Sequence, residues 1–212
     1  MATVLLDKPN IEKPKIEKAE ADPIEYHWTV ERFYRAANAN VFDDPSRLEV
    51  IQGRIIEKMP TGPLHTTISY DLAERLRETF GPGFLVRNER AIHIAFDGEP
   101  IPDIALVRGK SSDYREGHPT PEKVALLIEV SVTSVEYDLG EKALLYSQAG
   151  ISDYWAVLVN EAAIVVHREP TPDGYGEVMR LTGDDKLSTL AAPEAVWAVS
   201  ALLGHKEAPE EN

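Results

Sequence analysis

The sequence predicts a mixed α/β (α+β) domain, in which a β-sheet is flanked by helices. Two kinds of hydrophobic pattern support this fold class. Some segments repeat apolar residues every three or four positions, which is typical of amphipathic helices, and shorter segments alternate or are continuously apolar, which is typical of strands. With 212 residues, 43% hydrophobic and 27% charged, the chain is long enough to bury a core without disulfides.

The composition divides the chain into one domain and two tails. Residues 1–26 mix lysine, glutamate, proline and aspartate without periodicity, which predicts a flexible N-terminal tail. Residues 27–204 form the expected domain, and the polar residues 205–212 are a predicted flexible C-terminal tail. The first residues resemble neither a signal peptide nor a membrane span, so we expect a cytoplasmic protein with no membrane partner.

The first part of the domain predicts a helix, a hairpin and a second helix. Thr29 is a good N-cap for a short helix over residues 29–39. Residues 47–60 alternate around Gln52-Gly53, which indicates a β-hairpin whose glycine supplies the positive φ of the turn. Apolar residues at helical spacing then predict an amphipathic helix over residues 65–80.

Strands dominate the middle of the chain. Residues 84–96 alternate and predict one or two strands, and residues 101–109 predict another, with a proline near its start, where proline is tolerated. Residues 124–132 (VALLIEVSV) are almost continuously apolar. This indicates a strand buried on both faces, in the middle of the sheet.

The last part predicts a helix followed by more strands. Residues 134–150 form the expected helix, with Ala143, Leu144 and Ala149 towards the core and Gly150 as a C-terminal cap. Three strands and a short final helix complete the prediction, at residues 151–159, 162–169, 176–183 and 198–204.

Charge and cysteine content limit the possible functions. The chain carries 36 acidic and 22 basic residues, a net charge of −14, so its overall field repels nucleic acid. A role on nucleic acid therefore requires a local basic patch or bound metal ions. The chain has no cysteine, which excludes disulfides and thiolate metal sites.

Two acidic residues lie in apolar predicted strands, where an ionised carboxylate is unfavourable. Glu129 lies inside the most apolar predicted strand, and Asp103 lies at the start of another. An ionised carboxylate in such a place costs several kcal/mol unless an ion pair or a metal compensates it. If the two strands are neighbours, both groups emerge at one edge of the sheet. Such hard oxygen ligands suit one or two Mg²⁺ or Mn²⁺ ions.

The following helix offers a lysine to the same site. Asp138 and Lys142 are four residues apart, so they share a helix face that Tyr146 continues. Lys142 could reach back to the carboxylates and orient a nucleophilic water or stabilise charge on a phosphate. The alternative is an ordinary surface ion pair between Asp138 and Lys142.

This order of residues resembles the PD-(D/E)xK nuclease superfamily and, more narrowly, the Uma-two family of bacterial restriction-endonuclease-like proteins. The resemblance covers about residues 27 to 200. It includes the hairpin with a glutamate, Glu49, and the histidine that opens the next helix, His65. The remaining matches are Glu129, Ser131, Ser134, Asp138, Lys142, Tyr146, Gly150, Ile151, Tyr154 and Trp155.

The resemblance implies a restriction-endonuclease-like core with a divalent-metal site. Asp103 and Glu129 would be ligands, and the carbonyl of Val130 could add a third. The wider superfamily places its lysine two residues after the glutamate, where this chain has Ser131. The lysine is therefore expected at Lys142, whose long side chain can reach the same point from the next helix.

Further residues are candidates for contact with a substrate. Glu49 could line the site or pair with Lys142, although the strand pattern equally allows a solvent-facing position. His65 could meet a phosphate or transfer a proton, or be an ordinary polar loop residue. Arg87 and Arg90 could contact a nucleic-acid backbone or be solvated charges at a strand edge. Ser131 belongs to the same candidate group because it occupies the lysine position of the superfamily.

These observations lead to a main functional prediction and two alternatives. The main prediction is a Mg²⁺-dependent phosphodiesterase, a DNA endonuclease acting on double-stranded DNA as a homodimer. The acidic surface favours instead a non-catalytic module that keeps the nuclease fold for binding or assembly. A glycosidase with paired carboxylates is a third reading, without sugar-binding features to support it. No motif of P-loop hydrolases, zinc peptidases or α/β-hydrolases occurs.

Overall fold

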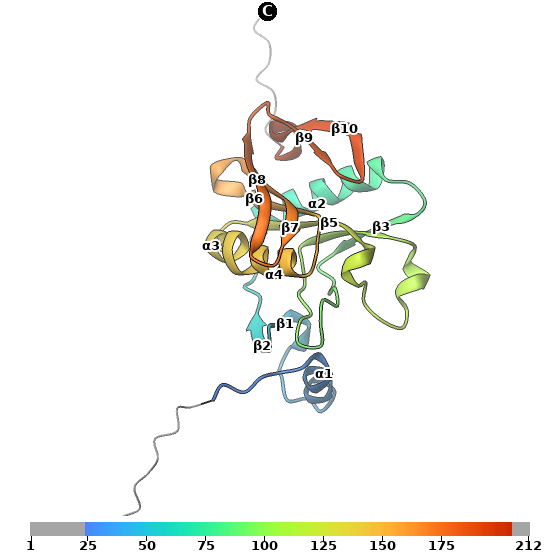
Figure 1. Cartoon of the computed structure of the whole chain (residues 1–212), viewed down its shortest axis with the longest axis vertical. Coiled ribbons are helices and arrows are strands. Elements are labelled where there is room, and N and C mark those ends of the chain that lie inside the picture. Colours follow the sequence, from blue (N-terminus) through green and yellow to red (C-terminus); the bar gives the residue numbers. More distant parts are fainter. Residues whose placement is uncertain (1–23, 205–212) are drawn as a thin grey trace, which may run out of the picture.

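The computed structural model describes residues 24–204. A six-stranded mixed sheet forms its centre, with helices on both faces (Figure 1), as the sequence predicts. The C-terminal tail predicted at residues 205–212 and all but the last three residues of the N-terminal tail lie outside the described residues.

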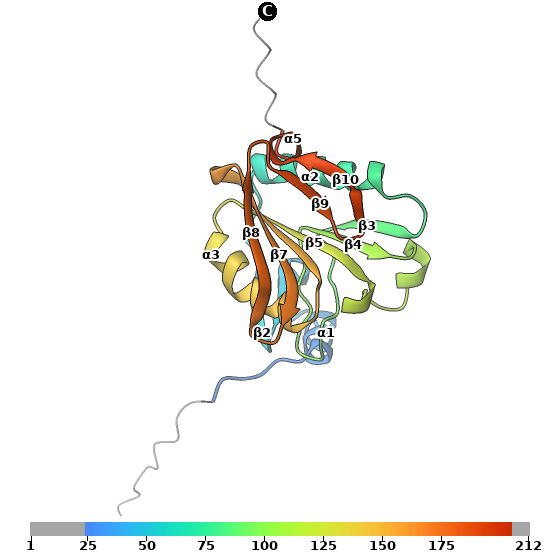
Figure 2. The ribbon, with the colours of Figure 1, turned by 45° about the horizontal axis from the view of Figure 1, so that its top comes forward.

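The strands of the central sheet follow the order β3-β4-β5-β6-β7-β8. All neighbours are antiparallel except β5 and β6, which are parallel. A parallel connection needs a crossover, and the helical segment between these two strands provides it (Figure 2). The strands are β3 (Phe84–Asn88), β4 (Ile104–Arg108), β5 (Val124–Ser131), β6 (Asp153–Leu158), β7 (Ala163–Thr171) and β8 (Gly174–Thr182).

Strand β5 is buried in the middle of the sheet, as its apolar sequence predicts. Every residue after Val124 in this strand is buried. Alternate side chains enter two different cores, as the two-residue period of a strand requires. Leu126 and Ile128 point into one core, whereas Leu127 points into the other.

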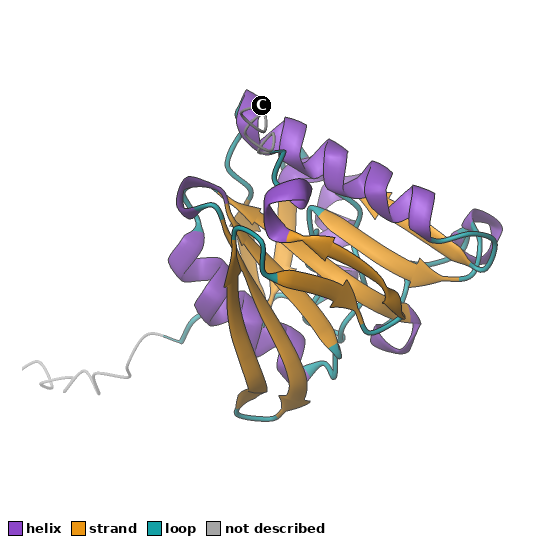
Figure 3. Cartoon of the chain, turned by 90° about the horizontal axis from the view of Figure 1, so that it is seen from above, coloured by secondary structure: helices purple, strands orange, loops and turns teal. Residues whose placement is uncertain are grey.

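Different elements cover the two faces of the sheet (Figure 3). One face packs against α2 (Pro63–Thr79), the short α5 (Val199–Leu202) and the strand pair β9 (Lys186–Thr189) and β10 (Ala192–Ala198). The other face packs against α4 (Ala143–Gln148), which supplies Leu145 and Tyr146 to the core.

A smaller N-terminal unit packs beside the sheet. It consists of α1 (Val30–Asn38) and the hairpin of β1 (Leu48–Ile51) and β2 (Arg54–Glu57), joined around Val30, Phe33 and Val50. The predicted cap forms, because the Thr29 hydroxyl accepts a hydrogen bond from the Arg32 amide. At the turn, Gly53 has a φ of 75°, and a Cβ there would lie 2.2 Å from the His27 ring. Only glycine fits this position.

The sequence reading needs three corrections. The strand pair β9–β10 was not predicted, and of the alternating residues 84–96 only 84–88 form a named strand. Leu144 was expected in the core but is exposed, at 38%. The reason is a π-helical turn, η4 (Asp138–Lys142), between α3 (Val135–Tyr137) and α4. Its extra residue per turn rotates α4, so that Leu145 and Tyr146 are buried instead.

No helix within residues 24–204 is both long and apolar enough to cross a membrane.

Candidate active site

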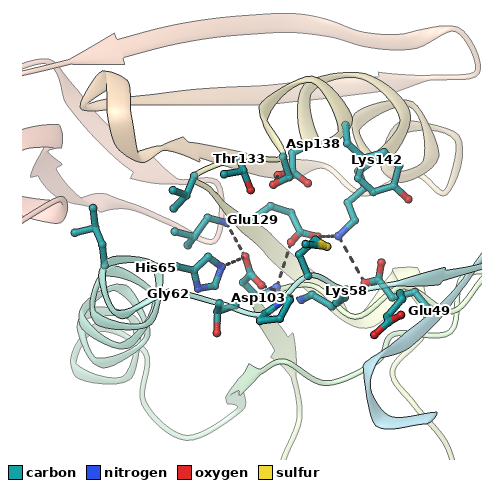
Figure 4. Close-up of a pocket in the computed structure, with 18 of the residues that line it drawn as sticks. Glu49, Lys58, Gly62, His65, Asp103, Glu129, Thr133, Asp138 and Lys142 are labelled. Atoms are coloured by element: carbon teal, nitrogen blue, oxygen red, sulfur yellow. Dashed lines mark hydrogen bonds and ion pairs between the residues drawn. The ribbon is translucent and has the colours of Figure 1, made fainter. Parts of the chain in front are cut away.

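A pocket of about 540 Å³ opens beside the end of β5 (Figure 4). Its wall comes from three parts of the chain: residues 57–65, which run from the end of β2 into α2; residues 129, 130 and 132–134 at the end of β5; and the segment of Tyr137, Asp138 and Lys142. Glu49 and Asp103 complete the lining. Segments far apart in sequence thus meet at one edge of the sheet.

The register of β4 and β5 brings the two unexpected carboxylates together. These strands are antiparallel neighbours, and Ile104 pairs with Ile128. The next pair along the register is therefore Asp103 and Glu129, which are 4% and 2% exposed. The Asp103 amide lies 3.4 Å from Glu129 Oε2. The structure therefore has the two strands as neighbours and the two carboxylates side by side, as the sequence predicts.

Three donors hold the Asp103 carboxylate. Lys58 Nζ lies 2.9 Å from Oδ1, while His65 Nε2 lies 2.9 Å and the Val130 amide 2.8 Å from Oδ2. Burial alone would raise the pKa of Asp103, but these partners outweigh it and hold the pKa well below the ordinary value. Asp103 is therefore an ionised carboxylate fixed at the base of the pocket.

The pKa values of Lys58 and His65, the two basic residues beside Asp103, are raised rather than lowered. Burial disfavours the charged form of Lys58, but the negative charges of Asp103 and Glu129 prevail and its pKa is raised. His65 is likewise opposed by burial, yet the hydrogen bond to Asp103 raises its pKa. Both side chains favour the positive form beside this carboxylate.

The Glu129 carboxylate has a different set of partners. Lys142 Nζ and the Tyr146 hydroxyl donate to Oε1 at 2.9 and 2.7 Å. Burial raises the pKa of Glu129 to about 7, against the attraction of Lys142. Lys142 keeps its charge, because Glu129 and Glu49 outweigh the cost of its burial and raise its pKa.

Glu49 is the third carboxylate of the pocket. It is 1% exposed, which excludes the solvent-facing alternative. Its Oε1 accepts a hydrogen bond from the Ile101 amide at 2.7 Å and lies 3.6 Å from Lys142 Nζ. Lys142 is thus shared between Glu49 and Glu129.

The alternative of a surface ion pair between Asp138 and Lys142 is wrong. Both residues are buried, and Asp138 accepts from the hydroxyls of Ser131 and Ser134 instead. Both ends of the π-helical turn therefore point inward, towards different partners. Such turns are often found at functional sites.

The sequence patterns do not predict that Lys58 belongs to the site. The weak signal for it was its place, directly after the second strand of a hairpin whose first strand carries Glu49. Tyr146 was recognised only as part of a helix face, and its hydrogen bond to Glu129 was not foreseen. Both contacts depend on distant segments, which a local sequence pattern cannot reveal.

Three candidate residues lie outside this pocket. Arg87 packs its guanidinium over the Tyr114 ring, at 5.5 Å, and Arg90 bonds the carbonyl beside it. Neither lines the pocket. Ser131 is fully buried and is occupied by its hydrogen bond to Asp138. The structure therefore does not bring these three side chains to the carboxylates.

Within the described residues, no three histidine or acidic side chains form a cluster that could hold a metal ion. Asp103 and Glu129, from neighbouring strands, offer a pair of carboxylates, each of which is already bonded to a lysine. Val130 contributes its amide to Asp103.

Comparison with known proteins agrees with this architecture. The crystal structure of a putative nuclease belonging to DUF820 from Anabaena variabilis ATCC 29413 matches with a TM-score of 0.64 at 17% sequence identity. The match covers 86% of this chain and 99% of that chain, so the two share a fold. No curated protein matches the chain. The model of the family Uma2, described as "Putative restriction endonuclease", matches residues 30–201. The chain therefore belongs to the Uma2 family, as its ordered motif residues predicted.

Proposed function

We propose that the protein is a divalent-metal-dependent phosphodiesterase that cuts DNA. One observation carries the proposal: Asp103 and Glu129, from neighbouring strands, meet at the base of an open pocket with a lysine beside each. Membership of a nuclease family gives this arrangement its chemical context.

The donor chemistry suits Mg²⁺ or Mn²⁺. Magnesium is usually held by one or two carboxylates, while water and substrate phosphate fill the other positions. Asp103 and Glu129 supply two hard oxygen donors, and within the described part of the chain the one hydrogen bond to Glu129 Oε2 is the 3.4 Å contact with the Asp103 amide. The pocket lining also has more acidic than basic side chains, which favours a cation: Glu49, Glu57, Asp103, Glu129 and Asp138 against Lys58, His65 and Lys142.

The chain's own residues would prepare the site. A bound divalent ion would neutralise phosphate charge and favour ionisation of water. His65 and the Val130 amide fix the orientation of Asp103. Tyr146 and Lys142 do the same for Glu129. The charge of Lys142 also stabilises the buried glutamate, so that Lys142 acts through Glu129 in this structure.

Plasmid nicking with Mg²⁺ or Mn²⁺ tests the proposal. The wild type should convert supercoiled DNA to nicked or linear DNA, and Asp103→Asn should reduce the rate at least about a hundredfold if the aspartate holds the ion. Asp71→Asn is the matched control, because Asp71 is an exposed residue of α2 outside the pocket lining and the change alters the net charge equally. Equal cleavage by wild type and Asp103→Asn would reveal a contaminating nuclease.

One observation favours a second candidate, a non-catalytic binding or assembly module. Asp103 and Glu129 each already have a lysine partner, so the charges of these two carboxylates are compensated without a metal. Such a pair can serve structure alone. If Mg²⁺ and Mn²⁺ produce neither cleavage nor a calorimetric signal, this candidate replaces the first.

We also propose that the protein acts as a homodimer, because one site in each chain would then face each strand of a duplex. Analytical ultracentrifugation of the full chain would test this. A monomer at all concentrations used for cleavage would contradict it.

A further inference from the structure

The ammonium group of Lys58 lies between two oxygen atoms that favour a cation. Its Nζ lies 2.9 Å from Asp103 Oδ1 and 2.9 Å from the carbonyl oxygen of Ile101. A carboxylate and a backbone carbonyl are oxygen donors of the kind that hard metal ions also prefer. Lys58 thus already supplies Asp103 with a positive charge.

A divalent ion bound to Asp103 would have to share this carboxylate with Lys58. Like charges a few ångströms apart repel strongly in a partly buried site, where solvent screening is weak. The Lys58 side chain is 18% exposed and Asp103 only 5%. The ammonium and the ion therefore compete for one largely buried anion.

The two lysines of the pocket differ in how firmly they are held. The side chain of Lys142 is 5% exposed and lies between Glu129 and Glu49. Among the described residues, Lys58 has one carboxylate within ion-pair distance, that of Asp103, and its side chain lines the pocket and is 18% exposed. Lys58 can therefore move away from its partner, whereas Lys142 is enclosed.

We propose that Lys58 is a resident counter-ion of Asp103 that a divalent metal ion must displace, so that Lys58 sets the metal affinity of the site. This inference rests on the proposed function, since it assumes that Asp103 is a metal ligand. It gives Lys58 a role opposite to that of a residue that helps to bind the metal: its removal strengthens binding.

Isothermal titration calorimetry with Mn²⁺ alone tests the inference on the full chain, without any measure of activity. Lys58→Gln removes the charge but keeps most of the side-chain length, and it should bind Mn²⁺ at least about fivefold more tightly than the wild type. Lys186→Gln is the matched control, because Lys186 is an exposed residue of β9 and its loss changes the net charge equally. Its Mn²⁺ affinity should stay close to that of the wild type.

A second variant, which keeps the charge of Lys58, keeps the inference testable even if Lys58→Gln does not fold. Lys58→Arg keeps the charge and offers a planar fork that can hold a carboxylate with two hydrogen bonds. It should bind Mn²⁺ more weakly than the wild type. Circular dichroism in EDTA would establish that each variant is folded before titration.

The outcomes separate this inference from the proposed function. Tighter binding by Lys58→Gln, together with weaker binding by Lys58→Arg, supports it. Equal or weaker binding by a folded Lys58→Gln overturns it while the metal site stands, and so does tighter binding by Lys58→Arg. Absence of Mn²⁺ binding in the wild type and in Lys58→Gln overturns the proposed function and this inference together.

Discussion

Lys142 carries a positive charge between two buried carboxylates. Its ammonium lies 2.9 Å from Glu129 Oε1 and 3.6 Å from Glu49 Oε1, and its side chain is 5% exposed. The two acids and the lysine are therefore mutually dependent. Removing one partner of such a group leaves a charge in a place where water cannot compensate it.

We accordingly expect Lys142→Met to destabilise the protein by roughly 3–5 kcal/mol, the usual effect of breaking a buried ion pair. The double variant Lys142→Met/Glu129→Gln should recover part of this loss, because it removes one of the two uncompensated acids. Urea unfolding in EDTA measures both free energies. A loss below about 1 kcal/mol for the single variant would place the pair among weak surface interactions and contradict the described burial.

His167 shows how a buried histidine makes stability depend on pH. Its ring centroid lies 5.0 Å from that of Tyr154 and 5.4 Å from that of Tyr175, and Nδ1 has no hydrogen-bond partner among residues 24–204. Burial lowers the pKa of His167 below its ordinary value of 6.5. Below pH 6.5 the unfolded chain binds a proton at His167 more readily than the folded protein does, so protonation favours unfolding. The stabilising contribution of the neutral His167 to the free energy of unfolding is therefore fully present above pH 6.5 and is lost as the pH falls.

The variant His167→Phe should therefore lose less stability than the wild type between pH 7.5 and pH 5.5. The expected difference between the two proteins is at most about 1.4 kcal/mol. Urea unfolding at both pH values measures it, and comparing the two proteins cancels the contribution of the acidic residues. A larger loss in His167→Phe would mean that the histidine is protonated in the folded state.

At the scale of elements, the crossover between β5 and β6 determines the site. This segment consists of α3, the π-helical turn η4 and α4, and it carries both Asp138 and Lys142 inward. It also ends at Gly150, whose φ of 77° is left-handed. By contrast, Gly140 lies within the turn, and a Cβ there would meet no atom within 4 Å.

These two glycines should respond to alanine in opposite directions. Gly140→Ala should stabilise the protein by up to about 1 kcal/mol, because alanine has the higher helix propensity. Gly150→Ala should destabilise it by roughly 1 kcal/mol, because alanine is strained at positive φ. Thermal unfolding of the two variants beside the wild type measures both changes. A loss of stability in Gly140→Ala would indicate that the π-helical turn needs glycine.

For the molecule as a whole, the net charge and the charge of the pocket lining have the same, negative sign. The chain carries a net charge of −14, and the pocket lining is acidic as well. DNA would therefore meet repulsion over most of the surface. A nuclease built on this chain would depend on divalent ions for binding as well as for chemistry.

This reasoning predicts that duplex DNA binds only when a divalent ion is present. Fluorescence anisotropy with a labelled duplex should show binding in Ca²⁺, which can replace Mg²⁺ without supporting rapid cleavage in many nucleases, and none in EDTA at equal ionic strength. Asp103→Asn should lose the Ca²⁺-dependent signal, because a hard cation prefers an anionic oxygen ligand. Equal binding in Ca²⁺ and EDTA would point to a basic surface away from the pocket.

Most of the element types, and the two carboxylates that an apolar strand disfavours, could be predicted from sequence patterns alone. Hydrophobic period is a local property, so α1, the hairpin, α2 and the central strand β5 could be read directly. The position of Glu129 within an apolar run is also visible in a short stretch of sequence. The strand pair β9–β10 has less regular alternation, and the π-helical turn has no distinct local pattern, so neither was predicted.

Which charged side chains come into contact depends on how distant segments pack. The pairing of β4 with β5 places Asp103 beside Glu129, and loops from other parts of the chain add Lys58 and His65. These contacts join residues 26 to 45 positions apart. No pattern within a single element encodes such distances, because side-chain electrostatics depends on neighbours that only folding brings within a few ångströms.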